Sequence, residues 1–347
     1  MRRIKLTIAY DGTNYVGWQL QPNGISIEET VTAALKKLLK EEVLLIGASR
    51  TDSGVHADGN IAVFDTESRI PGDKFRFALN EFLPDDIKVQ ESEEVPLTYH
   101  PRKVNSLKTY EYRILNRSLP VPKERNYAYF YYYPLDVDRM RKALPCLLGE
   151  HDFRSFCSIR TSVEDTVRRI TDVSLEKEGD VISFRITGTG FLYNMVRIIV
   201  GTLVKIGTGF WEPEMMQEIL EKRDRKFAGP RAPAMGLTLK EIREEKTLPA
   251  VTDEENAHWS YVLYQGKTRT EEKAYAVIRA CEDWAYEALL LRLTKQLSRN
   301  GALYVYVRDM TGRLRDGQEA DYFTFRKTWL EDWYVTSDKR KLEEAEE

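Results

Sequence analysis

Cysteine and histidine are scarce in this chain. Its 347 residues include three cysteines, Cys146, Cys157 and Cys281, and four histidines. An odd number of widely spaced cysteines excludes a disulfide framework and is typical of a reducing compartment. Cys146 and Cys157 flank His151, but no fourth ligand lies nearby, and no two histidines have the spacing of metal ligands. We therefore expect no zinc site and no metal cofactor.

Long apolar runs are also absent. The most apolar stretch, residues 191–206, contains Arg197 and Lys205, so it falls short of the roughly 20 apolar residues of a membrane-spanning helix. Residues 2–10 alternate apolar and polar side chains like a strand and lack the apolar core of a signal peptide. Together with a hydrophobic content of 42%, these features predict a folded cytoplasmic protein without membrane contact.

Neither sign of charge is in large excess. The chain has 52 basic and 55 acidic residues, and residues 251–347 contain 15 of the basic and 19 of the acidic ones. The two parts of the chain therefore carry small net charges, about +1 and −4. Overall charge does not indicate a nucleic-acid-binding protein, although a local basic groove is compatible with a nearly neutral chain.

Hydrophobic periodicity predicts two successive α+β units followed by an extension. We place the first unit at residues 1–103, the second at 104–246 and the extension at 251–347, after a polar linker. Ser26 followed by Glu29 is a capping box that starts a helix. Strands are predicted near residues 2–10, 42–48, 60–65, 87–91, 110–115, 127–132, 167–177, 181–187 and 236–242, and helices near 27–39, 73–81, 136–148, 191–206 and 214–222.

The extension is predicted to be a small α+β element. An apolar stripe from Ala274 to Leu291 predicts a helix, and residues 303–307 and 322–325 resemble strands. Its basic residues lie among many aromatic ones, a composition that can bind phosphates and stack bases. We favour the alternative that these aromatics pack on the rest of the protein or at a dimer interface.

The segment from Ser49 to Ala57 has the composition of a catalytic loop. Asp52 stands between Arg50 and Gly54 in a polar turn that follows an apolar strand. Arg50 is expected to keep Asp52 ionised, because a nearby positive charge lowers the pKa of a carboxyl group. An ionised, oriented carboxylate can act as a nucleophile or a general base. The alternative is an Asx turn in which Asp52 caps its own loop.

Seven motifs, in order along residues 1–243, resemble the TruA family of tRNA pseudouridine synthases. The segment from Arg50 to Ala57 reads RTDSGVHA and resembles the family's R-T-D-A-G-V-H-A signature. The remaining motifs are YDGTNYVGWQLQ at 10–21, Asn80 with LP at 83–84, His100 and Arg102 before YEY at 110–112, LLGEHDF at 147–153 with SF at 155–156, Phe191 with MVR at 195–197 and VG at 200–201, and AP at 232–233 with GL at 236–237.

This resemblance implies an α+β pseudouridine synthase fold, in which two pseudo-repeated halves share a central, mainly antiparallel sheet. It implies a homodimer that binds tRNA and isomerises uridines at positions 38–40 of the anticodon arm, without a cofactor. Asp52 corresponds to the essential carboxylate and Arg50 to a residue that helps to flip the base. Tyr110 corresponds to the tyrosine that stacks on uracil, Arg197 to the partner of Asp52, and Leu237 to a substrate-binding residue.

The chain departs from the family pattern at several positions and is thus a divergent member with a C-terminal extension. Ser49 stands where glycine is usual, and Ser53 replaces alanine. Tyr193 and Asn194 replace a basic or histidine pair before Met195, which removes positive charge from the expected RNA groove. Another RNA target is therefore an alternative to the anticodon arm.

Two further function classes were weighed. The tripeptide Asp52-Ser53-Gly54 also occurs in aspartic proteases, but a second copy is absent, and Arg50 would disfavour the proton that their two carboxyl groups share. A catalytically silent RNA-binding protein or chaperone is the non-enzymatic alternative. The presence of Asp52, Tyr110 and Arg197 together argues against it.

Overall fold

The computed structural model describes residues 1–158 and 165–244, together with the backbone of four strands between residues 260 and 327. The chain divides into two compact units, Met1–Ile242 and Arg243–Glu347. Each unit is described by itself.

The first half of unit 1 pairs three long strands with two helices. Alternating burial along β1 (Arg2–Tyr10) places Ile4, Leu6 and Ile8 in the core. Helix α1 (Ile27–Leu39) begins at the predicted capping box, with Glu29 N–H donating to Ser26 Oγ. The other elements are β2 (Ile46–Gly47), β3 (His56–Thr66), α2 (Phe75–Asn80) and β4 (Ile87–Val95).

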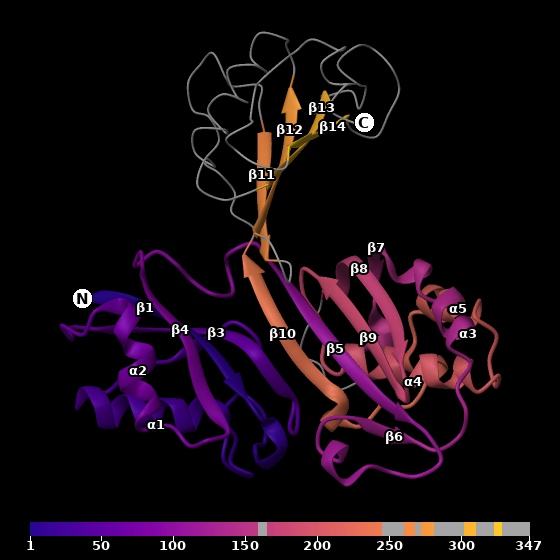
Figure 1. Cartoon of the computed structure of the whole chain (residues 1–347), viewed down its shortest axis with the longest axis horizontal. Helices are drawn as coiled ribbons and strands as arrows, with labels where there is room; N and C mark the ends of the chain where they lie inside the picture. The colour runs from indigo at the N-terminus through magenta and orange to yellow at the C-terminus, as the bar shows by residue number, and fades with distance from the viewer. Residues whose placement is uncertain (159–164, 245–259, 268–271, 281–301, 310–322, 328–347) are drawn as a thin grey trace. The chain divides into compact units, whose positions relative to one another are not determined.

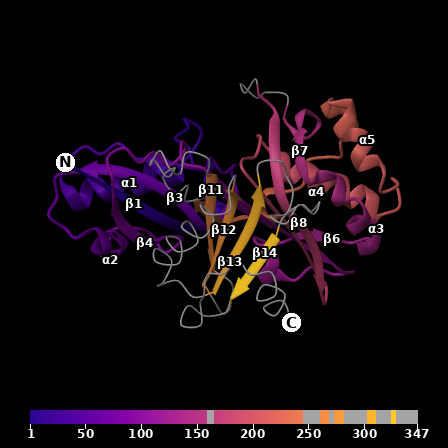
Figure 2. The ribbon, with the colours of Figure 1, turned by 90° about the horizontal axis from the view of Figure 1, so that it is seen from above.

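The second half has more strands and three helices. Helix α4 (Met195–Gly207) is buried almost along its whole length, which explains the apolar character of that stretch of sequence. The other elements are β5 (Ser106–Asn116), β6 (Tyr129–Tyr131), α3 (Val137–Lys142), β7 (Gly149–Asp152), β8 (Val167–Glu178), β9 (Val181–Gly188), α5 (Met215–Lys222) and β10 (Leu237–Glu244). Figures 1 and 2 both place α1 and α2 with β1, β3 and β4, and α3–α5 with β7 and β8.

One ten-stranded sheet connects the two halves. Its main order is β4-β1-β3-β10-β5-β9-β8-β7, with β2 attached to β3 and β6 attached to β5. The pairs β1–β3, β1–β4, β5–β9, β8–β9 and β7–β8 are antiparallel, as predicted. The late strand β10 lies between β3 and β5 and pairs with β3 in parallel, with Thr238 opposite His56. This insertion brings residues 237–239 next to the start of β3.

Several predicted elements are shorter in the structure, and three of them show the reason. The strand predicted for residues 42–48 is reduced to β2. The side chains of Val43 and Leu45 are buried in the alternating pattern of a strand, but their backbone does not belong to the sheet. Asp136 caps α3 as predicted, but the helix ends at Lys142 and continues as a 3₁₀ turn at Pro145–Leu147, where proline offers no N–H. Helix α4 begins at Met195 rather than 191, because Asn194 has a left-handed φ of 62°.

Glycine at position 201 allows α4 to contact the loop at 228–232. A Cβ atom built on Gly201 would lie 1.6 Å from the carbonyl oxygen of Pro230. We expect Gly201→Ala to lower the free energy of unfolding by about 3 kcal/mol, because neither backbone can yield without moving the loop. Gly190→Ala is the control, since its Cβ would meet Arg168 at an ordinary 3.5 Å. Denaturant unfolding of both variants measures the difference; equal midpoints would refute the prediction.

Unit 2 contains a four-stranded sheet in the order β11-β12-β13-β14. Its strands are β11 (Ser260–Lys267), β12 (Glu272–Ala280), β13 (Ala302–Asp309) and β14 (Phe323–Lys327). The strands predicted at 303–307 and 322–325 correspond to β13 and β14. The helix predicted from Ala274 is wrong as far as residue 280, because Tyr275, Val277 and Ile278 belong to an inner strand that pairs on both sides. The remainder of that predicted helix lies outside the described residues.

Candidate active site

Asp52 lies in the loop that connects β2 to β3. The backbone turns back at this point, with Val55 N–H donating to the Asp52 carbonyl oxygen (3.1 Å), and Gly54 has a φ of 76° that favours glycine. The side-chain hydrogen bond of Asp52 goes to Arg197 of α4. In the described structure, therefore, Asp52 is aimed across the fold rather than at its own loop, which argues against the Asx-turn alternative.

The motif at residues 10–21 forms the support of this loop. Trp18 N–H donates to the Thr51 carbonyl oxygen at 3.0 Å, and Gly54 N–H donates to the Tyr15 carbonyl oxygen at 3.3 Å. Gly17 has a φ of 107°, and a Cβ there would lie 2.6 Å from the Thr51 carbonyl oxygen. Two motifs that are some 30 residues apart in the sequence thus form one packed unit.

An ion pair connects Asp52 to Arg197. The Arg197 Nη1 atom lies 3.3 Å from Asp52 Oδ2, and the two side chains are 8% and 17% exposed. Arg197 is held in place because its Nε donates to the Ala232 carbonyl oxygen (2.8 Å) and its Nη1 to Asn194 Oδ1 (2.9 Å). Asn194, a departure from the family pattern, thus supplies both the left-handed start of α4 and a partner for this arginine.

Burial dominates the electrostatics of Asp52. Desolvation raises the pKa of its carboxyl group above the ordinary value, and the positive charges of Arg197 and Arg231 oppose this shift. The prediction that Arg50 lowers the pKa of Asp52 is therefore wrong. The Arg50 side chain is exposed and is not among the groups that act on Asp52. Arg50 is adjacent in sequence, but the buried cation comes from a helix 145 residues further along the chain.

Tyr110 lies on β5 and is also buried. Its hydroxyl is 3.0 Å from Ser49 Oγ, and its ring meets Phe191 edge to face with centroids 5.0 Å apart. Burial raises the pKa of Tyr110 to about 12 and the charge of Asp52 adds to this effect, so the phenol is neutral at physiological pH. The fold therefore brings Tyr110, Asp52 and Arg197 to one place. Leu237 is buried at the start of β10, directly before the residue that pairs with His56.

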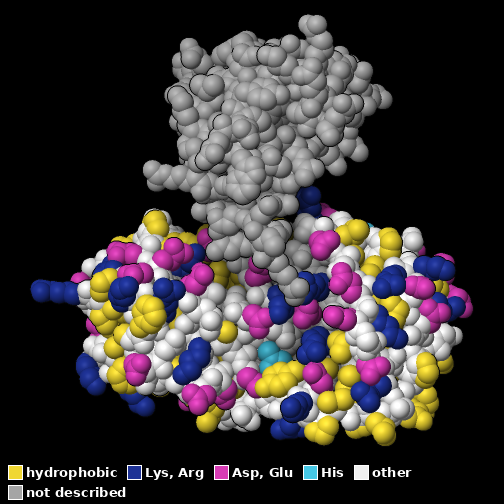
Figure 3. All heavy atoms as spheres, viewed as in Figure 1, with side chains coloured by type: hydrophobic (Ala, Val, Ile, Leu, Met, Phe, Trp, Pro, Cys, Tyr) yellow, Lys and Arg dark blue, Asp and Glu magenta, His cyan; other side chains and the backbone are white. Residues whose placement is uncertain are grey.

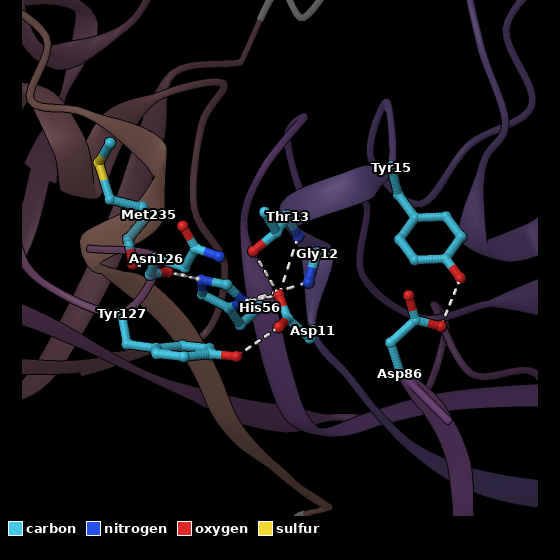
Figure 4. A network of polar contacts seen from close by, with 9 residues as sticks. All are labelled: Asp11, Gly12, Thr13, Tyr15, His56, Asp86, Asn126, Tyr127 and Met235. Carbon is cyan, nitrogen blue, oxygen red and sulfur yellow. Dashed lines mark hydrogen bonds and ion pairs between the residues drawn. The ribbon is translucent and has the colours of Figure 1, made fainter. Parts of the chain in front are cut away.

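His56 connects three loops near this site (Figure 4). Its Nε2 atom lies 2.8 Å from the Asn126 carbonyl oxygen and 3.2 Å from that of Met235, so this nitrogen carries a hydrogen. Its Nδ1 atom accepts the Gly12 N–H at 3.1 Å. The same Nδ1 atom lies 3.1 Å from Asp11 Oδ1. His56 thus joins the first loop of the chain to the 234–236 turn that precedes Leu237.

Asp11 extends the same network. Its carboxylate accepts hydrogen bonds from the Thr13 N–H and from the Tyr127 hydroxyl, the latter at 2.6 Å. Hydrogen bonds to Thr13 and Tyr127 and the charge of His56 outweigh the effect of burial and lower the pKa of Asp11. Figure 4 shows Thr13 and Tyr127 meeting at the Asp11 carboxylate next to His56, and the ring centroids of His56 and Tyr127 are 5.3 Å apart. The network thus connects the loops around the site through side chains other than that of Asp52.

Sequence reasoning missed three contributors. Arg231 directly precedes the Ala232-Pro233 motif, and only its place in the fold shows that its charge acts on Asp52. The contact of the Ser49 hydroxyl with Tyr110, and the position of His56 between three loops, are likewise visible only in the fold. The position of Arg231 next to a matched motif is the one sequence signal that could have indicated it. Among the described residues, no group of three His, Cys, Asp or Glu side chains is arranged to hold a metal ion.

The surface does not by itself indicate a binding partner. On the described part of the face shown in Figure 3, basic and acidic side chains are interspersed, and neither sign forms a continuous area. No helix within the described residues is long and apolar enough to cross a membrane. The feature that indicates function is therefore the buried pair of Asp52 and Arg197.

Comparison with known proteins identifies relatives of unit 1. A family model described as tRNA pseudouridine synthase matches residues 6–102 and 143–243. The tRNA pseudouridine synthase A 2 of Clostridium perfringens is 50% identical over 242 residues, which are 70% of this chain and 99% of that protein. The tRNA pseudouridine synthase A of Acetivibrio thermocellus is also 50% identical, and that of Brevibacillus brevis is 47% identical, with the same coverage.

Proposed function

The chain belongs to the tRNA pseudouridine synthase family and isomerises uridine in tRNA, and from this premise we propose that Asp52 is its essential carboxylate and the anticodon arm its target. The observation that carries the proposal is the buried pair of Asp52 and Arg197. The alignments span nearly the whole length of the relatives with 242 residues of this chain, which supports assigning the activity to unit 1.

The reaction requires an extruded uridine. The bond from N1 of uracil to carbon 1′ breaks, the base turns, and carbon 5 bonds to carbon 1′ while its hydrogen leaves and N1 gains a proton. Asp52 serves either as the nucleophile at carbon 1′ or as the base at carbon 2′, and both roles need the ionised carboxylate. Arg197 favours that ionised form against the effect of burial. Extraction of the base costs a few kcal/mol, which stacking partners must offset.

The neighbouring residues have the chemistry for this task. Tyr110 offers a neutral aromatic ring beside Asp52 on which uracil can stack. Arg50 is exposed next to Asp52, where it can take the place of the extruded base or contact a phosphate. Leu237 supplies an apolar surface at the start of β10. We assign Tyr110 and Leu237, together with Arg197, to substrate binding, and Arg50 to the catalytic residues beside Asp52, where it assists the flip.

The assembly and location implied by the resemblance are part of the same proposal. A homodimer would hold one tRNA across both subunits, and positions 38–40 would be its targets. Cytoplasmic location is supported by Cys146 and Cys157, which are both free thiols.

The proposal is tested with tRNA transcripts that carry tritium at carbon 5 of uridine. Release of tritium into water measures the isomerisation, and transcripts with cytidine at positions 38, 39 and 40, singly and together, identify the target. We expect the triple replacement to abolish release. Undiminished release from that transcript would place the target elsewhere in RNA, and binding without release from any transcript would favour the RNA-binding alternative.

A further inference from the structure

The Ser49 hydroxyl makes a contact that has no assigned role in the proposed reaction. Its hydroxyl is 3.0 Å from the Tyr110 hydroxyl, and both residues are almost fully buried, at 7% and 6% exposure. Ser49 lies on the Asp52 loop, whereas Tyr110 lies on β5. The hydrogen bond therefore connects the loop of the carboxylate directly to the ring that is proposed to stack on uracil.

A buried polar network fixes the backbone of Ser49. Asn60 of β3 uses its Nδ2 atom to donate to the Ser49 carbonyl oxygen at 3.0 Å and to the Tyr10 hydroxyl at 3.2 Å. The Tyr10 hydroxyl in turn is 2.7 Å from Thr51 Oγ1. Strands β1 and β3 thus anchor both Ser49 and Thr51. The loop has little freedom to move because each of these groups is shielded from water.

Successive side chains of the loop point in different directions. Ser49 and Thr51 point into the network and are each 7% exposed, whereas Arg50 is exposed and Asp52 faces Arg197. Two side-chain bonds therefore connect this loop to the second half of unit 1: Asp52 to Arg197 on helix α4, and Ser49 to Tyr110 on strand β5. Together they set the separation between the carboxylate and the tyrosine ring.

From this geometry we propose that Ser49 is a positioning residue for the isomerisation, and that its hydroxyl fixes the Tyr110 phenol relative to Asp52. The inference rests on the proposed role of Tyr110. A serine hydroxyl suits the task, since it can either donate to or accept from the phenol.

A double-mutant cycle tests the proposal. Ser49→Ala, Tyr110→Phe and the double variant are compared with the unaltered full-length protein by single-turnover tritium release at saturating enzyme and by tRNA affinity. We expect Ser49→Ala to lower the single-turnover rate about tenfold with the affinity for tRNA unchanged, because the ring loses its orientation but not its surface. In the Tyr110→Phe background the same change is expected to have less than about a twofold effect, because the hydroxyl it acts on is gone.

Ser53→Ala is the matched control. Its hydroxyl is on the same loop and donates to the Tyr15 carbonyl oxygen at 3.3 Å, away from Tyr110. We expect its rate to stay within about twofold of the unaltered protein.

Several results would overturn the inference. These are an unchanged rate for Ser49→Ala, an equal loss in both Tyr110 backgrounds, or a loss of tRNA affinity that accounts for the whole effect. A melting temperature for each variant, with assays well below it, separates misfolding from mispositioning. If the unaltered protein releases no tritium, the proposed function itself is refuted, and this outcome is distinct from a failure of the inference about Ser49.

Discussion

Asp52→Asn is expected to abolish tritium release, with a loss of at least about 1,000-fold in the single-turnover rate. A general base or nucleophile contributes roughly 10²–10⁴ to a rate, and asparagine can perform neither task. It has the same shape, and its oxygen can still accept the hydrogen bond from Arg197 that Asp52 accepts at 3.3 Å. The expected loss is therefore chemical rather than structural. Single-turnover release at saturating enzyme, with tRNA affinity measured in parallel, checks it.

Stability provides the control for this variant. Burial raises the pKa of the folded Asp52 above its unfolded value, so the folded protein binds this proton more tightly. The resulting stability is present below the unfolded pKa and is lost as the pH rises through the folded pKa. Asparagine resembles the neutral acid at every pH. We therefore expect Asp52→Asn to be at least as stable as the unaltered protein at pH 7 and similar to it in acid.

Two outcomes would contradict the proposed role of Asp52. Release by Asp52→Asn within about tenfold of the unaltered protein would exclude it as the essential carboxylate. A variant that melts much lower at pH 7 would show that the carboxylate is mainly structural. In that case a loss of activity would no longer identify the catalytic group.

The sequence was most informative where local chemistry decides the structure. The capping box at Ser26 and Glu29 located the start of α1 to the residue, because the cap needs only neighbouring backbone groups. The alternation of apolar residues likewise located β1 and β9. These features depend on contacts within a few residues, which periodicity and capping patterns record directly.

Predictions failed where a distant partner decides the structure. Residues 43–45 have the alternating burial of a strand but do not belong to the sheet. Residues 274–280 fit the apolar pattern of a helix as well as that of an inner strand. The same limit applies to the site. Local reasoning chose Arg50 as the charge beside Asp52, whereas the fold supplies Arg197. Only the resemblance to a family indicated that partner in advance, since no local pattern links residues so far apart.

Arg197→Met is expected to shift the acid limb of the pH–rate profile to higher pH. The charge of Arg197 is the largest influence that lowers the pKa of Asp52 against burial. Removal of that charge favours the neutral carboxyl group, so the pKa of Asp52 rises further and a higher pH is needed to ionise it. At neutral pH the rate should fall at least about tenfold, and part of this loss should be recovered by raising the pH. Single-turnover release between pH 5 and 9 measures both effects.

Arg197→Lys separates charge from geometry. Lysine keeps a positive charge, but its single amino group cannot replace the guanidinium nitrogens with which Arg197 binds Asp52, the Ala232 carbonyl oxygen and Asn194. Its acid limb should therefore lie between those of the unaltered protein and Arg197→Met. The matched control is Arg185→Met, which removes an exposed arginine that pairs with Glu111 at 2.6 Å on the neighbouring strand and should leave the profile unchanged. An acid limb that stays in place in Arg197→Met, or that moves to lower pH, would mean that Arg197 does not control the ionisation on which catalysis depends.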